Sequence, residues 1–468
     1  MDNALPSHVQ QGVADPVSAV SSMTLTQALQ AADRAAAAFD QWSKVGPTER
    51  RRILLRAADL FEAGKERLAQ AMASETGAAP AWIGFNAMLS ASLIREAAAL
   101  TTQITGQVFQ SDHMENLSMA MRIPAGVVLS IAPWNAPAIL SVRAIATPLA
   151  CGNTVVLKAS ELCPRTHRTI VDLFLEAGVP EGVLEFVTHE AQDAAAIVEA
   201  LIAHPKVRRV NFTGSTRVGR IIGETAGRHL KPALLELGGK APLIVLDDAD
   251  LDEAVSAAAF GAYMHQGQIC MSTEKLVVDE RVADLFVEKL AAKAATLTAG
   301  NPAKTNAVLS SVIDQNAVKR VADLVADALA KGATQRAGGR VEDTYVDAIL
   351  LDHVTPDMKV YHEETFGPCV SVIRVKDVDE AVRVANDTEY GLAAAIFGRD
   401  VDRALSVGRR IESGLVHING PTVQDEAHVP FGGVKASGYG RFNGQPSIDF
   451  FTELKTLTIQ HGHRHYPI

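Results

Sequence analysis

Short apolar runs and helical patterns alternate along most of this chain, and this alternation restricts the fold more than any other feature. Four of the apolar runs are rich in branched side chains, as buried strands are; they cover residues 153–160, 183–188, 207–215 and 241–248. Apolar residues spaced three and four apart predict helices between them, at 167–178 and 191–204. Strands that alternate with helices form a parallel sheet covered on both faces. Ligands of such sheets bind at the carboxyl ends of the strands.

The same alternation resumes after residue 270 and predicts a second α/β domain. Strands are expected at 272–280, 348–354 and 371–377, and helices at 283–298 and 317–332. The beginning of the chain predicts an irregular arm to about residue 23, followed by helices at 24–45, 47–61, 67–76 and 82–103. Thr26 is the expected cap of the first helix. A final strand at 449–460 has no partner nearby, so it either closes the sheet of its own domain or pairs with another subunit.

Charge and cysteine content exclude several classes of function. The 468 residues carry a formal net charge of −10, which repels nucleic acid and anionic membranes. The four cysteines are widely spaced without a CxxC pair, so neither a disulfide framework nor a metal site is expected. The first residues lack the pattern of a secretory signal, and prolines interrupt the longest apolar stretch, at 123–157. We therefore expect a cytoplasmic protein that binds neither nucleic acid nor membranes.

Two turns that follow predicted strands are candidate nucleotide-binding sites. Gly214, Ser215 and Gly219 open a helix, where glycines let the backbone approach a phosphate and the helix N-terminus offers N–H donors. Lys158 and Glu161 follow another strand. A carboxylate in that place accepts from a ribose 2′-hydroxyl and repels a 2′-phosphate, which favours NAD over NADP. Taken alone, each pattern also fits an ordinary turn.

Three residues form a candidate catalytic set. Cys270 has glycine and polar neighbours, whereas the other three cysteines lie in or beside apolar segments and are expected to be inert. Glu236 ends an apolar run before two glycines, and a carboxylate there could take a proton from a thiol or from water. Asn135 follows a strand, where its amide could donate to an oxyanion together with the backbone N–H of Cys270. An inert thiol, a solvated glutamate and a turn asparagine are the alternatives.

Seven motifs, in this order, resemble those of the NAD(P)-dependent aldehyde dehydrogenases, from about Thr24 to the end of the chain. They are APWN, KASE, FTGS, LELGGK, GQIC, EETFGP and PFGGVKASG, and together they are highly specific. The resemblance implies that Cys270 is the nucleophile, Glu236 the general base and Asn135 the oxyanion-binding amide. It also implies NAD as cofactor and a set of cofactor contacts, which comprises Trp134, Lys158, Ser160, Glu161, Gly214, Ser215, Gly219, Leu237, Glu364 and Phe366.

The resemblance further implies the architecture of the subunit. An aldehyde dehydrogenase combines a Rossmann-type cofactor domain, an α/β catalytic domain and a small β oligomerisation element. In this sequence we expect the cofactor domain at 1–104 and 125–238, the catalytic domain at 239–440, and the oligomerisation element at 105–124 and 441–468. Because members of the family form dimers or tetramers, we expect a homodimer or homotetramer that the final strand helps to build.

The expected substrate is a benzaldehyde-type aldehyde, hydroxylated or otherwise substituted, that is oxidised to its acid in aromatic catabolism. The stretch 417–444 resembles the benzaldehyde, vanillin and salicylaldehyde dehydrogenase branch of the family. Ala136 is small where relatives with aliphatic substrates often carry a large aromatic residue, so a ring has room there. Arg143 could meet a polar ring substituent or, equally, form an ion pair. The expected substrate pocket comprises Ala136, Ile139, Arg143, Ile269, Met271 and Phe431.

Other functions stay open on the sequence alone. A broad-specificity, aliphatic or semialdehyde dehydrogenase would carry the same motifs. A relative that transfers the acyl group to CoA is disfavoured by Glu236, because a water-activating base serves hydrolysis. A non-catalytic scaffold has no use for Cys270, Glu236 and Asn135 together. A cysteine hydrolase needs a histidine base, for which His265 is the nearest candidate.

Overall fold

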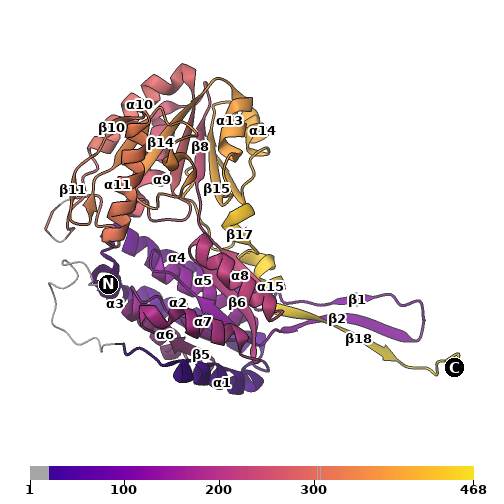
Figure 1. Ribbon diagram of the computed structural model, residues 1–468. Coiled ribbons are helices and arrows are strands. Elements are labelled where there is room, and N and C mark those ends of the chain that lie inside the picture. The colour runs from indigo at the N-terminus through magenta and orange to yellow at the C-terminus, as the bar shows by residue number, and fades with distance from the viewer. Residues whose placement is uncertain (1–19, 303, 306) are drawn as a thin grey trace.

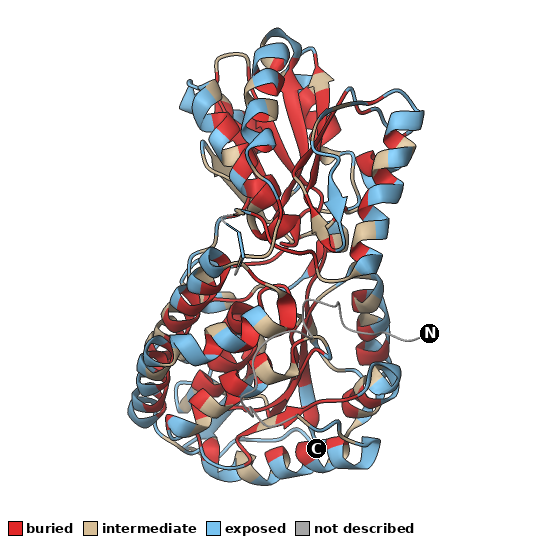
Figure 2. Cartoon of the chain, turned by 90° about the vertical axis from the view of Figure 1, so that its left-hand side faces the viewer, coloured by how far each residue is buried: buried red, intermediate tan, exposed pale blue. Residues whose placement is uncertain are grey.

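The chain folds into two α/β lobes, each built on its own sheet, and a narrow arm of strands that projects from the first lobe (Figure 1). This computed structural model describes residues 20–302, 304–305 and 307–468, so most of the expected N-terminal arm lies outside the described residues. Buried residues follow the strands and the inward helix faces of both lobes, and the outer helix faces are exposed (Figure 2). The predicted α/β class, with parallel sheets covered by helices, is confirmed.

The first lobe contains a six-stranded sheet of order β17-β7-β6-β3-β4-β5. Five strands run parallel, and β17 lies antiparallel to β7 at one edge. The strands are β3 (Val127–Ile131), β4 (Thr154–Lys158), β5 (Leu184–Val187), β6 (Val207–Thr213), β7 (Ala233–Glu236) and β17 (Gly438–Tyr439). Successive side chains enter two different apolar clusters, because neighbouring residues of a strand point to opposite faces.

Helices cover both faces of this sheet. Helices α1, α7 and α8 pack on one face, and α2, α4, α5 and α6 pack on the other. The helical segments of the lobe are α1 (Leu25–Trp42), α2 (Pro47–Ala63), α3 (Lys65–Thr76), α4 (Pro80–Leu100), α5 (Pro137–Ala150), α6 (Pro164–Glu176), η1 (Ala191–Asp193), α7 (Ala194–Ala203), α8 (Thr216–Arg228) and α15 (Gly444–Phe451). Thr24, rather than the expected Thr26, caps α1, because Thr24 and Gln27 form a reciprocal capping box.

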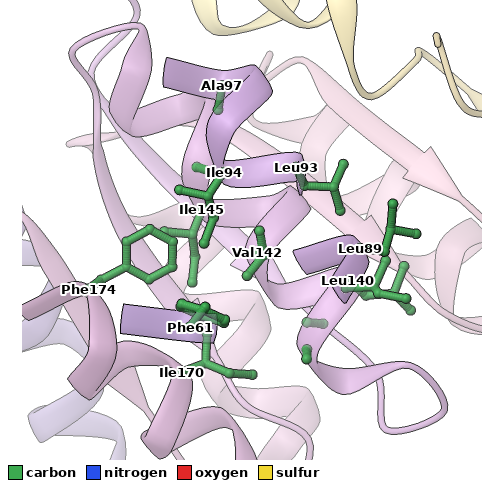
Figure 3. Close-up of a cluster of buried hydrophobic side chains, with 14 of the residues drawn as sticks. Phe61, Leu89, Leu93, Ile94, Ala97, Leu140, Val142, Ile145, Ile170 and Phe174 are labelled. Carbon is green, nitrogen blue, oxygen red and sulfur yellow. The ribbon is translucent and has the colours of Figure 1, made fainter. Parts of the chain in front are cut away.

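Large apolar side chains lock α4 and α5 onto α2 and α6. Phe61 of α2 and Phe174 of α6 lie beside Ile94 and Ile145 of the other two helices (Figure 3). The two phenylalanine rings meet edge to face with their centroids 5.6 Å apart. Burial of each such side chain stabilises the fold by about 1.5–3 kcal/mol. This packing holds the start of α5, and with it the loop that carries Asn135.

The second lobe contains a seven-stranded sheet of order β10-β13-β14-β9-β8-β15-β16, in which only β10 runs antiparallel to its neighbour. Its strands are β8 (Ala241–Val245), β9 (Thr273–Asp279), β10 (Thr334–Ala337), β13 (Ile349–Asp352), β14 (Cys369–Val375), β15 (Ala393–Phe397) and β16 (Leu415–Ile418), with a separate hairpin of β11 (Val341–Glu342) and β12 (Tyr345–Val346). One face is covered by α9 (Leu251–Tyr263) and α10 (Glu280–Ala295). The other is covered by α11 (Gln315–Ala330), α12 (Lys359–His362), α13 (Val378–Asn386) and α14 (Val401–Gly408).

The arm is a three-stranded antiparallel sheet of β1 (Gln107–Phe109), β2 (Asn116–Pro124) and β18 (Thr452–Gln460). Strands β2 and β18, each of 9 residues, pair along their whole length. The final strand therefore closes a sheet with its own chain, which is one of the two expected arrangements. Its first three expected residues, 449–451, belong instead to α15, whose Ile448 and Phe451 are buried in the first lobe.

Two sequence-based boundaries change in the structure. Gly438 and Tyr439 were expected in the segment 239–440 of the second lobe, but they pair with β7 of the first sheet. The residues of helix α15 were expected to belong to the arm, but this helix packs on the first lobe. Strand β7 itself was not predicted, because its four residues, ALLE, include no β-branched or aromatic side chain that would indicate a strand. In each instance a contact with a distant part of the chain decides the placement, and such a contact leaves no local pattern.

Candidate active site

Cys270 lies on a sharply bent segment between the two lobes' sheets, after η2 (Met264–Gly267) and before β9. His265, Gln266 and Gly267 all have positive φ, at 49°, 56° and 69°. A side chain at Gly267 would meet the carbonyl oxygen of Gly367 at 2.2 Å, so only glycine fits there. Cys270 is half-buried, whereas the other three cysteines are fully buried, as their apolar surroundings predicted.

Glu236 ends β7 and is buried almost completely. Among the described residues neither of its carboxylate oxygens has a hydrogen-bond partner at normal distance. Burial raises the pKa of Glu236 to about 7, although the nearby Cys270 thiol and Arg143 act in the opposite direction. Burial, and next the negative charge of Glu236, also raise the pKa of the Cys270 thiol well above its usual value. The predicted base and nucleophile therefore share one dry environment and influence each other.

Asn135 is held between the two lobes by two hydrogen bonds. Its Nδ2 donates to the carbonyl oxygen of Gln268 at 3.0 Å, two residues before Cys270. The backbone carbonyl oxygen of Asn135 accepts from the indole Nε1 of Trp82 at 2.8 Å. An amide nitrogen carries two hydrogens, so a second one stays available for an oxygen bound beside Cys270.

A cavity of about 290 Å³ ends at Cys270 and Asn135. All six residues expected in the substrate pocket line it: Ala136, Ile139, Arg143, Ile269, Met271 and Phe431. Sequence reasoning missed further lining residues, chiefly Trp82 and Phe85 of α4 and Asp425 of the loop after β16. Two aromatic residues three apart on an expected helix were the available signal, but the face of α4 that meets the cavity is decided only by tertiary packing.

Stacked rings form one wall of this cavity. The ring centroids of Trp82 and Phe85 are 5.5 Å apart, and those of Trp82 and His265 are 4.8 Å apart at 12°. Burial lowers the pKa of His265 to about 3, so the imidazole is neutral. It packs behind Trp82 as an aromatic plate, and neither ring nitrogen has a hydrogen-bond partner among the described residues. This arrangement fits the wall of an apolar pocket and not the base of a cysteine hydrolase.

Arg143 lies at the cavity and is paired. Its Nη2 is 2.5 Å from a carboxylate oxygen of Asp425, and both side chains are buried. The guanidinium carbon lies 4.3 Å from the centre of the Phe431 ring. Of the two interpretations of Arg143, the ion pair is present, and the same residue also lines the pocket.

The expected ribose contacts cluster where β4 ends. The Nζ of Lys158 is 3.9 Å from a carboxylate oxygen of Glu161, which is exposed. Burial lowers the pKa of Lys158. The backbone N–H of Ser160 donates to Nδ1 of His167 at 3.1 Å, which fixes the turn between these two charges.

The expected phosphate turn lies where β6 ends. Ser215 caps α8 and accepts from the backbone of Val218. The backbone N–H of Gly214 donates to the carbonyl oxygen of Glu236 at 3.0 Å, which connects the turn to the end of β7. A side chain at Gly219 would meet Leu237 at 2.3 Å, so this glycine allows α8 to pack on the segment after Glu236.

Glu364 and Phe366 belong to the second lobe and lie near the carboxyl ends of the first lobe's strands. The carboxylate of Glu364 accepts from the backbone N–H of Gly239 at 2.8 Å. Burial, and then the charge of Glu274, raise the pKa of Glu364 to about 8. The ring of Phe366 meets that of Trp134 edge to face, with centroids 5.9 Å apart.

The donor set along this edge fits a nicotinamide dinucleotide. An ammonium and a carboxylate lie at the end of β4, and a capped helix N-terminus with free N–H donors lies at the end of β6. These groups suit ribose hydroxyls and a pyrophosphate. In the described part of the chain no group of three or more histidine, cysteine or acidic side chains is placed to bind a metal ion, and no helix there is long and apolar enough to cross a membrane.

Known proteins are similar to this chain in sequence and in fold. The chain is 59% identical over 452 residues to a vanillin dehydrogenase of Pseudomonas sp. (strain HR199 / DSM 7063), covering 97% of this chain and 94% of that protein. It is 52% identical over 454 residues to a salicylaldehyde dehydrogenase of Pseudomonas putida, with the same coverage. A crystal structure of a salicylaldehyde dehydrogenase from Pseudomonas putida G7, complexed with salicylaldehyde, superposes with a TM-score of 0.94 at 51% identity and covers 96% of this chain and 93% of that one. The model of the aldehyde dehydrogenase family matches residues 8–457, and the chain thus belongs to this family of NAD(P)-dependent oxidoreductases that act on aldehydes.

Proposed function

We propose that this protein oxidises substituted benzaldehyde-type aldehydes to their carboxylic acids, with NAD as the cofactor, in the breakdown of aromatic compounds. The observation that carries the proposal is the cavity that ends at Cys270 and Asn135 and is walled by the stacked rings of Trp82 and Phe85. Flat apolar walls favour an aromatic ring over a flexible chain. The relatives named for vanillin and salicylaldehyde support the same class of substrate.

The chain's own groups account for the acyl-transfer chemistry. Glu236, as a carboxylate, takes the proton of the Cys270 thiol while the sulfur adds to the aldehyde carbon. The oxygen of the adduct becomes an alkoxide that accepts hydrogen bonds from Asn135 Nδ2 and the backbone N–H of Cys270. The bound, oxidised cofactor supplies the acceptor for the hydride that leaves this carbon.

A thioester on Cys270 then remains, and hydrolysis completes the reaction. Glu236 first releases to solvent the proton that it took from the thiol. It then takes a proton from water, whose oxygen attacks the thioester carbon, and it passes this proton to the sulfur as the thiolate leaves. The carbon–sulfur bond breaks, the acid leaves, and the thiol of Cys270 is restored. A general base with a pKa near neutrality suits this step, because it is ionised at the working pH and still accepts a proton.

The remaining assignments follow from this placement. We assign Trp134, Glu364 and Phe366 to the nicotinamide end of the cofactor, and Lys158, Ser160 and Glu161 to the adenosine ribose. Gly214, Ser215, Gly219 and Leu237 then form the pyrophosphate turn. The arm of β1, β2 and β18 exposes apolar residues such as Val108 and Leu454, which supports its role as the contact of a homodimer or homotetramer.

A panel of aldehydes tests the substrate class. With NAD, we expect kcat/KM for hydroxylated benzaldehydes to exceed that for hexanal or succinic semialdehyde by at least about tenfold, since pocket contacts discriminate on this scale. NADH absorbance measures the rates, with and without CoA and before and after iodoacetamide. Equal or higher values for the aliphatic aldehydes would contradict an aromatic substrate, and formation of acyl-CoA would contradict hydrolysis.

Variants of the Arg143–Asp425 pair test a direct contact with the ring substituent. Arg143→Ala alone leaves a buried carboxylate unpaired, which is destabilising, so the double variant Arg143→Met with Asp425→Asn serves as the charge-balanced form. We expect the double variant to raise KM about tenfold for a hydroxylated benzaldehyde and much less for benzaldehyde, because one hydrogen bond from a charged donor is lost. Equal effects on both aldehydes would show that Arg143 only packs.

Glu161 tests the preference for NAD. Removal of its charge in Glu161→Gln should raise kcat/KM with NADP about tenfold, because the carboxylate no longer repels a 2′-phosphate. Glu181→Gln is the matched control. Glu181 is exposed on the same lobe but precedes β5, so it lies at the amino ends of the parallel strands, opposite to Glu161. An unchanged ratio of NADP to NAD activity in Glu161→Gln would place the ribose elsewhere.

The raised pKa of Glu236 predicts the pH dependence of thioester hydrolysis. Below about pH 7 the carboxyl is protonated and cannot accept a proton, so the hydrolysis rate should rise with pH and level off above this value. Glu236→Gln should slow hydrolysis by about 10²–10⁴-fold and let the acyl-enzyme accumulate on Cys270. Rapid-quench mass spectrometry follows the acyl adduct. A wild-type rate that is flat from pH 5.5 to 9 would rule out Glu236 as the base.

A further inference from the structure

A second buried ion pair lies directly behind the catalytic residues. The Nζ of Lys240 is 2.6 Å from Oε2 of Glu274, and the two side chains are 0% and 4% exposed. Lys240 follows the base Glu236 by four residues, and Glu274 follows Cys270 by four. The pair therefore joins the segment of the base to the segment of the nucleophile. A pair buried this deeply is not explained by stability, because desolvation offsets most of its attraction.

Glu274 also holds the turn that contains Glu364 and Phe366. Its carboxylate accepts from the backbone N–H of Thr365 at 2.8 Å and from that of Phe366 at 3.0 Å. Lys240 adds a contact of 3.4 Å to the hydroxyl of Thr365. On the other side of the turn, Arg320 donates to the carbonyl oxygen of Thr365 at 3.0 Å. The turn is therefore held through the backbone N–H groups of Thr365 and Phe366 and through the carbonyl oxygen of Thr365.

These hydrogen bonds keep the turn in a backbone conformation that would be unfavourable without them. Phe366 has a φ of 46°, which is unfavourable for a residue with a bulky side chain. In this conformation its ring meets Trp134, and the neighbouring Glu364 carboxylate rests against Gly238, where an added side chain would approach it to 2.8 Å. Two hydrogen bonds to a buried carboxylate are each strong enough to offset such strain.

We propose that Glu274, neutralised by Lys240, is a positioning residue that sets the 364–366 turn for the nicotinamide half of the dinucleotide. The inference rests on the proposed role of Glu364 and Phe366 as cofactor contacts. Glu274 does not touch the cofactor or the reacting atoms; it acts through the two backbone N–H groups that it binds. Lys240 supplies the positive charge that pairs with this buried carboxylate.

Two charge-balanced double variants isolate the role of the carboxylate. Lys240→Met with Glu274→Leu removes both charges and the acceptor, whereas Lys240→Met with Glu274→Gln removes both charges but keeps an amide oxygen that can accept from the turn. Buried ion pairs replaced in this balanced way often retain stability. Asp352→Ala is the control, because Asp352 is also a buried carboxylate and forms an ion pair with Arg374 in the same lobe, away from the turn.

The two readouts that decide the inference do not depend on turnover. Cofactor affinity is titrated with NAD and with NADP by quenching of tryptophan fluorescence, and hydrogen exchange of the Thr365 and Phe366 amides is measured without cofactor. We expect the leucine variant to bind about tenfold more weakly than the glutamine variant and to exchange these amides faster, because the turn loses its acceptor. We expect KM for the aldehyde at saturating cofactor, and alkylation of Cys270 by iodoacetamide, to be the same in both.

Three results would overturn the inference: equal affinities of the leucine and glutamine variants, unchanged amide exchange, or an equal loss of affinity in Asp352→Ala. If the leucine variant does not fold, Lys240→Met with Glu274→Met replaces it, and affinity and amide exchange equal to those of the glutamine variant would equally overturn the inference. Failure of the proposed function gives a different pattern. A wild type whose fluorescence does not respond to either dinucleotide would refute the cofactor placement, and a wild type without aromatic preference would refute the substrate while the affinity comparison stands.

Discussion

The exclusion of water from the Glu236 carboxylate and the Cys270 thiol is the constraint on which the rest of the site depends. In water the carboxyl would ionise near pH 4 and would be too weak a base for the role that we propose for Glu236 near neutrality. Burial raises the pKa of Glu236 to about 7, and it also raises the pKa of the Cys270 thiol, which therefore needs a base to take its proton. A dry surrounding also strengthens the hydrogen bonds that Asn135 can donate to a developing oxyanion.

The two lobes create this surrounding together. The first lobe contributes Glu236 from the end of β7, and Asn135 from the loop that the α4–α5 packing holds. The second lobe contributes Cys270 from the bent segment before β9. Because the lobes meet here, glycine is required where backbones touch: a side chain at Gly239 would meet the carbonyl oxygen of Cys270 at 2.3 Å. The Lys240–Glu274 pair lies next to this junction, before β8 and in β9 of the second lobe, and connects it to the 364–366 turn.

Much of this arrangement follows from local patterns. Alternating strand and helix signals predict both α/β lobes, and the rule that ligands bind at the carboxyl ends of parallel strands places Lys158, Ser215 and Asn135 at the same end of the sheet. The patterns could not reveal β7, which has no β-branched or aromatic residue, or Asp425, which lies in an irregular loop. Trp82 and Phe85 were also missed, because α4 is apolar on most sides and its sequence does not show which face meets the cavity.

The sequence by itself determined the fold class, the family and the chemical groups, because these depend on side-chain period and on motifs of neighbouring residues. Only the tertiary structure decided how Arg143 is used: its buried partner Asp425 is 282 residues away in the chain. The same holds for the neutral state of His265 and the raised pKa of Glu236, since both result from burial among residues of different segments. A pKa depends on the surroundings of a group in space, and a linear sequence does not contain those surroundings.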